Sequence, residues 1–155
     1  MRRKIKKNFN TEPDHIHDSL LVSKFINYIM LDGKKWAARK IVYGAFEIIK
    51  EKEKSDPMML FETAIKNVGP NMEVRSRRVG GANYQVPREV RQERKQFLAM
   101  NWIIGAARAG KGSSMEKRLA DEIILASKGE GEAAKKRENI HKMAEANRAF
   151  AHFAW

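Results

Sequence analysis

One short stretch of the sequence resembles a motif that binds nucleotide phosphates, but it lacks a required residue. Gly105–Gly112 (GAARAGKG) is similar to a P-loop, which needs Ser or Thr directly after its Lys to hold magnesium. Gly112 occupies that place, and the stretch joins two predicted helices, whereas a P-loop joins a strand to a helix. We therefore interpret Lys111 as a loop cation that contacts the backbone of a partner.

The four histidines could supply metal ligands, but their placement does not favour a metal site. His15 and His17 lie in a segment without helical or strand periodicity, which offers neither fixed geometry nor supporting hydrogen bonds. His141 and His152 are eleven residues apart, so they would share a helix face but be too distant to share a metal. Contact with a base or a phosphate is the better interpretation of His141 and His152.

Acidic residues do not form a catalytic pair in this sequence. Asp121 and Glu122 are adjacent on a predicted helix, so they point in different directions, and we interpret them as solvated helix surface. The sequence also indicates no Ser-His-Asp set and no activated nucleophile. We therefore predict that the chain is not an enzyme and that it uses no cofactor and no metal.

The charge of the chain is its most informative property. The 155 residues contain 31 Lys and Arg against 19 Asp and Glu, which gives a net charge of +12. A compact chain with this excess repels itself, so a polyanionic partner is the simplest compensation, and solubility alone is the alternative. There is no cysteine, so disulfides and thiolate metal sites are excluded. No apolar run approaches the ~20 residues that span a bilayer, so we expect no membrane partner.

The basic residues gather in separate clusters, and we predict that these clusters bind RNA. Guanidinium groups suit bidentate phosphate contacts, and a tyrosine can stack on a base. Four residues of the last helix are spaced by four, seven and four, which predicts one stripe at ~100° per residue. The predicted RNA-binding residues are Arg2, Arg3, Lys4, Lys6, Lys7, Lys34, Lys35, Arg75, Arg77, Arg78, Tyr84, Arg91, Arg94, Lys95, Arg108, Lys111, Lys135, Lys136, Arg137, His141, Lys142, Arg148 and His152, and the stripe consists of Arg137, His141, Arg148 and His152.

The elements that must position these residues follow from apolar periodicity and from helix caps. Residues 1–17 have no periodicity and are predicted to form an extended basic N-terminal arm, followed by a helical domain over residues 18–155. Asp18 or Ser19 would cap a first helix that ends at Gly33. A second helix follows Lys34-Lys35, with an inward stripe predicted at Ala37, Ile41, Ala45 or Gly44, and Ile48/Ile49. Asp56 and Pro57 begin a third helix, and Gly69-Pro70 ends it.

A change of pattern then predicts a β-hairpin over residues 72–87. Met72–Val79 and Ala82–Pro87 are extended runs on either side of Gly80-Gly81, and Pro87 is predicted to end the second run. An isolated hairpin is marginal in water. We therefore expect its base to pack on helices and its tip to project as an arm that a partner orders.

Three more helices complete the prediction. The fourth begins near residues 89–92, and its expected core stripe is Phe97, Met100, Ile104 and Ala107, with Leu98 and Trp102 beside it. Ser113 and Glu116 form a predicted capping box for the fifth helix, and the sixth runs from about Glu132 toward Phe153. The predicted fold is mainly α, a single domain of about six helices with a protruding hairpin between the third and the fourth.

Long motifs in this framework resemble one known family. Glu73–Pro87 (EVRSRRVGGANYQVP) resembles the arm of the bacterial and organellar small-subunit ribosomal protein S-seven family. Asp32–Lys35 (DGKK), Lys40–Ala45 (KIVYGA) and the C-terminal run Lys135–Trp155 (KKRENIHKMAEANRAFAHFAW) resemble the same family, in the same order.

The resemblance implies six helices with a protruding hairpin and a structural role in the ribosome. Members of the family bind the 3′ major domain of small-subunit rRNA, nucleate assembly of the head, and contact neighbouring small-subunit proteins. They lie near the exit site, where the hairpin is close to mRNA and tRNA. Some bacterial members also repress translation of their own operon. The implied location is the ribosome of a bacterial cytoplasm or of an organelle.

The sequence departs from the family pattern at several positions, which affects individual contacts and not the implied role. Asn83 stands where Thr is usual, Asn139 removes a negative charge, and Lys142 lacks the bidentate fork of Arg. Ala154 replaces a basic residue, and the loop after Arg108 lacks the usual Lys-Arg pair. Two alternatives remain from the residues alone: a DNA-binding module that places a helix in the major groove, and an RNA-processing enzyme.

Overall fold

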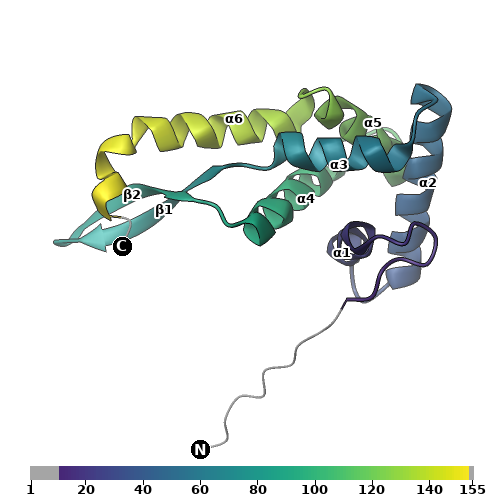
Figure 1. Cartoon of the computed structure of the whole chain (residues 1–155), viewed down its shortest axis with the longest axis horizontal. Helices are drawn as coiled ribbons and strands as arrows, with labels where there is room; N and C mark the ends of the chain where they lie inside the picture. The colour runs from purple at the N-terminus through teal and green to yellow at the C-terminus, as the bar shows by residue number, and fades with distance from the viewer. Residues whose placement is uncertain (1–10, 154–155) are drawn as a thin grey trace, which may run out of the picture.

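The computed structural model describes residues 11–153, which form a helical protein with one long hairpin (Figure 1). Its elements are α1 (Leu20–Ile29), α2 (Lys35–Glu53), α3 (Pro57–Val68), β1 (Met72–Val79), β2 (Ala82–Glu89), α4 (Gln92–Ala109), α5 (Met115–Ser127), α6 (Gly131–Ala146) and a 3₁₀ helix, η1 (Arg148–Phe153). The predicted fold class is therefore confirmed, including the position of the hairpin between α3 and α4.

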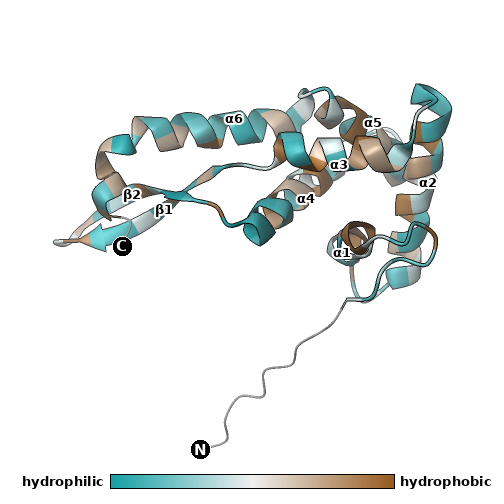
Figure 2. Ribbon diagram, in the orientation of Figure 1, coloured by the Kyte–Doolittle hydropathy of each residue, from teal (hydrophilic) through white to brown (hydrophobic). Residues whose placement is uncertain are grey.

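Helices α1 to α5 surround one apolar core, and we call them the body. Helix α5 packs against α2, α3 and α4, so it lies at the centre of the body. In Figure 2 the ribbons of α1, α3 and α5 accordingly contain brown, apolar segments. The largest fully buried side chains are Phe25, Phe61, Ile26, Ile49, Met100, Ile103, Ile104, Leu119, Ile123, Val22, Val42 and Val68. Phe97, which was predicted to join the core, is only half-buried and packs edge-on against Tyr28 at 5.3 Å.

The buried stripe of α2 confirms the predicted Ala45 and Ile49, but the first part of the stripe lies one residue later than predicted. Ala37 and Ile41 are at the rim of the core, and the inward positions are Ala38, Val42, Ala45, Phe46 and Ile49. Several apolar residues in this helix occur as adjacent pairs, and helical periodicity cannot choose between the members of such a pair. Contact with α1 on one side and α5 on the other decides the choice.

The predicted start of α3 is confirmed, whereas the predicted end of α1 is wrong. The Asp56 carboxylate accepts a hydrogen bond from the Met58 amide at 3.0 Å, as an N-cap does, and Pro57 is the first helical residue. Helix α1 ends at Ile29, earlier than the predicted Gly33, which instead adopts a φ of 72° in the following turn.

The N-cap of α5 is Ser114 and not the predicted Ser113. Its hydroxyl accepts a hydrogen bond from the Lys117 amide at 3.4 Å. The two serines are adjacent, and the loop before α5 contains Gly112 with a φ of 86°. That left-handed residue directs the chain so that the second serine meets the helix start.

A buried carboxylate links α5 to α6. Glu122, which was interpreted as solvated surface, is 8% exposed, and its Oε1 atom accepts a hydrogen bond from the Ala133 amide at 2.9 Å. It thereby satisfies one of the free N–H groups of the first turn of α6. A Cβ atom added at Gly131 would lie 2.9 Å from the same oxygen, so only glycine fits this turn.

The hairpin is longer than predicted, because β2 continues to Glu89. Pro87 lies inside the strand, opposite Val74, and does not end it. Each strand has only one neighbour, so the missing N–H of a proline can face away from the ladder. Gly80 and Gly81 form the turn with φ values of 57° and 90°, the two positive angles that a tight hairpin turn requires.

The last helix is shorter than predicted and is followed by a separate turn. Helix α6 ends at Ala146, and the Asn147 side chain donates a hydrogen bond to the Met143 carbonyl at 2.7 Å. The chain then folds back as η1 onto the hairpin, as Figure 1 shows, because Phe150 and Phe153 pack on Tyr84. We call β1, β2 and η1 together the arm.

The predicted attachment of the hairpin base is confirmed, since α6 runs along the hairpin and contacts both strands. Val86 is the buried hydrophobic residue of β2, at 3% exposure.

Residues 1–10 of the predicted N-terminal arm lie outside the described residues, whereas residues 11–17 contact α2. Asp14 is 4% exposed, and it accepts hydrogen bonds from the Ile16 and His17 amides and, at 2.7 Å, from the Tyr43 hydroxyl. Burial alone would raise the pKa of Asp14, but these hydrogen bonds outweigh burial and lower it. Burial and the Asp14 carboxylate raise the pKa of Tyr43 to about 12.

Candidate nucleic-acid interface

The three arginines of β1 lie in different environments. Arg75 forms an ion pair with Glu73 at 2.6 Å. Arg77 donates a hydrogen bond from Nη1 to the Phe153 carbonyl at 3.0 Å and thereby links β1 to η1. Arg78, next to the turn, is exposed and has no hydrogen bond or ion pair within residues 11–153. Of the three, Arg78 is the one whose charge is available at the tip.

Tyr84 lies opposite Arg77 in the hairpin and contacts protein rings. Its ring centroid is 5.2 Å from that of Phe150 and 5.4 Å from that of Phe153. The side chain is half-buried, so its ring is already engaged within the arm. The proposed stacking of Tyr84 on a base would have to use the remaining exposed part.

Four of the predicted RNA-binding residues converge on residues 67–73, which we call the junction. The junction comprises the end of α3, the connecting segment and the start of β1. From α6, Arg137 donates to the Asn67 carbonyl, and the His141 Nε2 atom accepts from the Asn71 amide at 3.1 Å. From α4, Lys95 donates to the Asn71 side chain at 2.7 Å, and Arg94 approaches Glu73 at 3.4 Å. These residues fix the direction in which the hairpin leaves the body.

The charge of His141 follows from this position. Burial lowers its pKa, and the nearby charges of Arg137 and Lys95 lower it further. The ring is therefore neutral at pH 7, which agrees with Nε2 acting as an acceptor toward the Asn71 amide.

The predicted basic stripe on the last helix is wrong as a continuous feature. Arg137 and His141 lie on α6, but Arg148 and His152 lie on η1, after the regular helix has ended. The spacing of 100° per residue does not extend across Asn147 into a 3₁₀ turn. Arg148 is exposed, and the His152 ring contacts the Ala149 carbonyl at 2.9 Å and the Phe153 ring at 4.0 Å.

The remaining predicted residues divide into paired and unpaired cations. Lys135 pairs with Glu132, and Lys142 pairs with Glu138, both along the surface of α6. Arg108 donates a hydrogen bond to the Ile29 carbonyl at 3.0 Å, so it joins α4 to α1. The exposed cations of the predicted set whose side chains form no hydrogen bond or ion pair in the described part of the chain are Lys34, Lys35, Arg78, Arg91, Lys111, Lys136 and Arg148. Arg2, Arg3, Lys4, Lys6 and Lys7 lie outside the described residues.

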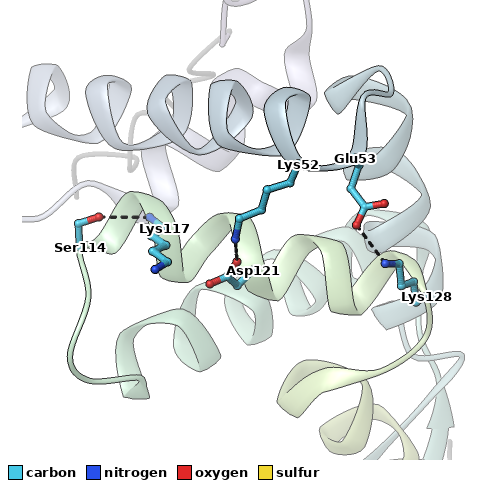
Figure 3. A network of polar contacts seen from close by, with 6 residues as sticks. All are labelled: Lys52, Glu53, Ser114, Lys117, Asp121 and Lys128. Atoms are coloured by element: carbon cyan, nitrogen blue, oxygen red, sulfur yellow. Dashed lines mark hydrogen bonds and ion pairs between the residues drawn. The ribbon is translucent and has the colours of Figure 1, made fainter.

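The edge between α2 and α5 shows the opposite arrangement. Lys52 pairs with Asp121, and Glu53 pairs with Lys128 at 3.0 Å, so cations and carboxylates alternate across the two helices (Figure 3). Charge on this edge is compensated within the protein. A phosphate surface gains little from meeting such an edge, whereas each unpaired cation elsewhere can release a counterion on binding.

Sequence reasoning missed two features of the interface. Arg88 is exposed on β2, opposite Glu73, and the predicted second strand ended one residue before it. Trp36 is 77% exposed and follows Lys34-Lys35 directly. An apolar residue within a run of four cations over residues 34–40 was the signal that could have identified it.

The stretch that resembled a P-loop covers the end of α4 and the loop before α5. It therefore joins two helices, whereas a P-loop joins a strand to a helix. The Arg118 side chain donates to the Gly110 carbonyl and holds this loop on α5. Among the described residues, no group of three or more His, Cys, Asp or Glu side chains could hold a metal ion. No helix in that part of the chain is long and apolar enough to cross a membrane.

Comparison with known proteins identifies the family of the chain. The family model described as Ribosomal protein S7p/S5e matches residues 1–148. The small ribosomal subunit protein uS7 of Thermotoga petrophila is 55% identical over 155 residues, which is 100% of both chains. The protein of the same name from Carboxydothermus hydrogenoformans is 60% identical over 143 residues, 92% of both chains, and that from Mycoplasmopsis synoviae is 53% identical over 154 residues, 99% of both. The chain therefore belongs to the ribosomal protein S7p/S5e family.

Proposed function

We propose that the protein is a structural component of the small ribosomal subunit that binds rRNA and performs no chemistry. The observation that carries this proposal is the identity of 55–60%, over most or all of both chains, to relatives named small ribosomal subunit protein uS7. The net charge of +12 and the unpaired cations on several elements support the same role.

The proposal includes a location within the subunit. The protein binds the 3′ major domain of the rRNA, nucleates assembly of the head beside neighbouring small-subunit proteins, and lies near the exit site with its hairpin close to mRNA and tRNA. The cations near the N-terminus, Arg2, Arg3, Lys4, Lys6 and Lys7, add to this contact. The compared relatives are bacterial, which favours a cytoplasmic ribosome over an organellar one.

The distribution of the unpaired cations favours this role over binding to a single nucleic-acid duplex. Lys34 and Lys35 begin α2, Arg91 precedes α4, Lys111 lies in the loop before α5, and Arg78 lies near the hairpin turn. Cations on separate elements can meet phosphates of several RNA helices that converge on one protein. The deep, narrow major groove of A-form RNA admits no helix, so shape and unpaired bases would provide the specificity.

The test is binding of the purified protein to an in-vitro transcript of the 3′ major domain, compared with a transcript of another rRNA domain and with duplex DNA. If six to ten phosphates are engaged, affinity for the first transcript should fall about 10³- to 10⁵-fold between 50 and 200 mM salt. A flat salt response, or equal affinity for duplex DNA, would contradict the proposal.

A variant with Arg78→Ala and Arg91→Ala addresses the predicted contacts directly. Both side chains are exposed and have no partner within the described chain, so thermal stability should change little. The slope of log affinity against log salt should fall by about two, because two counterions fewer are released. A double variant with Lys52→Ala and Lys128→Ala, which removes two internally paired cations, is the matched control and should leave the slope almost unchanged.

A further inference from the structure

Trp36 is the most exposed large apolar side chain in the described part of the protein. Its exposed fraction is 77%, whereas Trp102 in the core is 7% exposed. No other aromatic ring of residues 11–153 packs on it, although aromatic contacts occur in the core and in the arm. Because its own chain buries so little of the Trp36 side chain, contact with a partner would bury apolar surface that folding leaves exposed.

The surroundings of Trp36 are cationic. Residues 34–40 read KKWAARK, with four cations and no acid. Lys34 and Lys35 precede the tryptophan at the start of α2, and the Lys40 Nζ atom lies 6.0 Å from the centre of its ring. No side chain caps this helix start, and its first turn contains no acidic residue. A protein surface of this charge is complementary to phosphates on either side of an aromatic face.

A cavity of about 420 Å³ adjoins the ring and has room for a flat group. Trp36, Arg39, Lys40 and Tyr43 line it, together with Gly44, Glu47 and Glu116. The Arg39 Nε atom is buried and has no hydrogen-bond partner among the described residues. The two carboxylates disfavour a phosphate inside the cavity, so the phosphates of a bound strand would lie on the side of Lys34 and Lys35.

We propose that Trp36 is a stacking platform for an unpaired base of RNA, with the flanking phosphates neutralised by Lys34 and Lys35. This inference rests on the proposed rRNA-binding function and adds a residue that contacts a base within it. Stacking tolerates any base because every base has a π-face, and its contribution to affinity does not depend on counterion release. Loss of Trp36 and loss of a neighbouring lysine should therefore have different salt signatures.

The experiment compares Trp36→Ala, Trp36→Phe and Lys35→Gln in binding to the 3′ major domain transcript over a range of salt concentrations. Trp36→Ala should weaken binding roughly 5- to 150-fold with the salt slope unchanged, and Trp36→Phe should retain most of the affinity. Lys35→Gln should reduce the slope by about one. Met59→Ala, which truncates another exposed apolar side chain at 69% exposure on α3, is the matched control and should bind as the wild type does.

A spectroscopic readout separates stacking from an indirect structural effect. The difference in tryptophan fluorescence between the wild type and Trp36→Phe reports Trp36 alone. The contributions of the other two tryptophans, Trp102 and Trp155, cancel in this difference. RNA should quench this difference signal if a base stacks on the ring. An unquenched signal together with wild-type affinity of Trp36→Ala would overturn the inference.

Failure of the inference can be told apart from failure of the proposed function. If the wild type binds the transcript with steep salt dependence and Trp36→Ala does the same, only the inference fails. If the wild type shows no such binding, the proposed function fails first. If Trp36→Ala binds the transcript normally but no longer binds another small-subunit protein, the face is a protein-docking surface, and the stacking proposal is overturned.

Discussion

The body and the arm are held together by different forces. The body has one apolar core, in which rings such as Phe25, Phe46 and Phe61 contact one another at 4.9 and 5.6 Å. The arm has little buried surface, and its order comes from the ladder between β1 and β2, the rings on Tyr84, and the bond from Arg77 to η1. This difference indicates that the apolar core of the body supplies most of the stability of the protein, whereas the arm contributes less.

The two regions also use their cations differently. On the α2–α5 edge of the body, lysines neutralise carboxylates of the neighbouring helix (Figure 3). At the junction, cations hold the base of the arm through backbone carbonyls and amide side chains. At the tip, Arg78 has no partner within residues 11–153. Charge is therefore left available for RNA where it is not needed for folding.

The largest expected effect comes from the core of the body. Phe61→Ala should reduce the free energy of unfolding by about 3–5 kcal/mol, because a side chain with 0% exposure and two ring contacts is replaced by a cavity. Urea unfolding monitored by circular dichroism measures this. The control, Met59→Ala on the exposed face of the same helix, should change stability by less than about 0.5 kcal/mol. A loss below 1 kcal/mol for Phe61→Ala would contradict the distinction between body and arm.

The second effect is at Glu122, which joins the body to the helix that supports the arm. Glu122→Ala should cost about 1–3 kcal/mol, because the buried Ala133 amide loses its acceptor at the start of α6. Glu122→Gln keeps a carbonyl acceptor of similar shape and should cost much less at pH 7. Equal losses in the two variants would show that packing, and not the hydrogen bond, is what α6 requires.

The pH dependence of the same site has a defined sign. Burial raises the pKa of Glu122 above its ordinary value of 4.5, although the hydrogen bond from Ala133 opposes the shift. A carboxyl whose folded pKa is raised favours folding most when it is protonated, and that contribution disappears as the pH rises through the folded pKa. The wild type should therefore lose stability relative to Glu122→Gln as the pH rises above 4.5, measured by denaturant unfolding at several pH values. A constant difference would contradict the shift.

Features set by neighbouring residues in the sequence were easier to predict than features set by contacts between distant segments. Caps such as Asp56, and the turn at Gly80-Gly81, are local signals, so the six α-helices and the hairpin were predicted in the correct order, whereas η1 was not predicted. The choice between adjacent apolar residues in α2, and the burial of Glu122, depend on neighbours that are distant in sequence. The end of α6 was not predicted for the same reason. Phe150 and Phe153 lie beyond the end of the helix and pack on Tyr84 of β2, which is distant in the sequence.

The candidate site shows the same division. The clusters of cations were visible in the sequence, but the residues that are free for RNA were not. Arg137 and Lys95 are bound to the junction, whereas Arg78 and Arg91 have no partner within the described chain. Pairing is a property of the folded chain, so spacing alone cannot reveal it.

The third effect is confined to the arm. Phe150→Ala should lower the local opening free energy of β2 by about 0.5–1.5 kcal/mol, because the contact with Tyr84 at 5.2 Å is lost. Amide hydrogen exchange of β2 measures this opening, and the global unfolding midpoint should hardly move. Arg148→Ala, an exposed residue of the same turn, is the control and should change neither quantity. A large drop in global stability would show that the arm belongs to the cooperative unit of the body.

The smallest effect is expected on the α2–α5 edge. The side chains of Lys52 and Asp121 are each 44% exposed, so water and salt screen their attraction. A double-mutant cycle with Lys52→Ala and Asp121→Ala should give a coupling energy of about 0.2–1 kcal/mol, which disappears near 1 M salt, where the Debye length is about 3 Å. Lys50→Ala, an exposed lysine of the same helix without a partner among the described residues, should show no coupling to Asp121. A coupling above 2 kcal/mol would mean that paired charges hold α2 on α5, and charge would then serve folding in the body as well as contact in the arm.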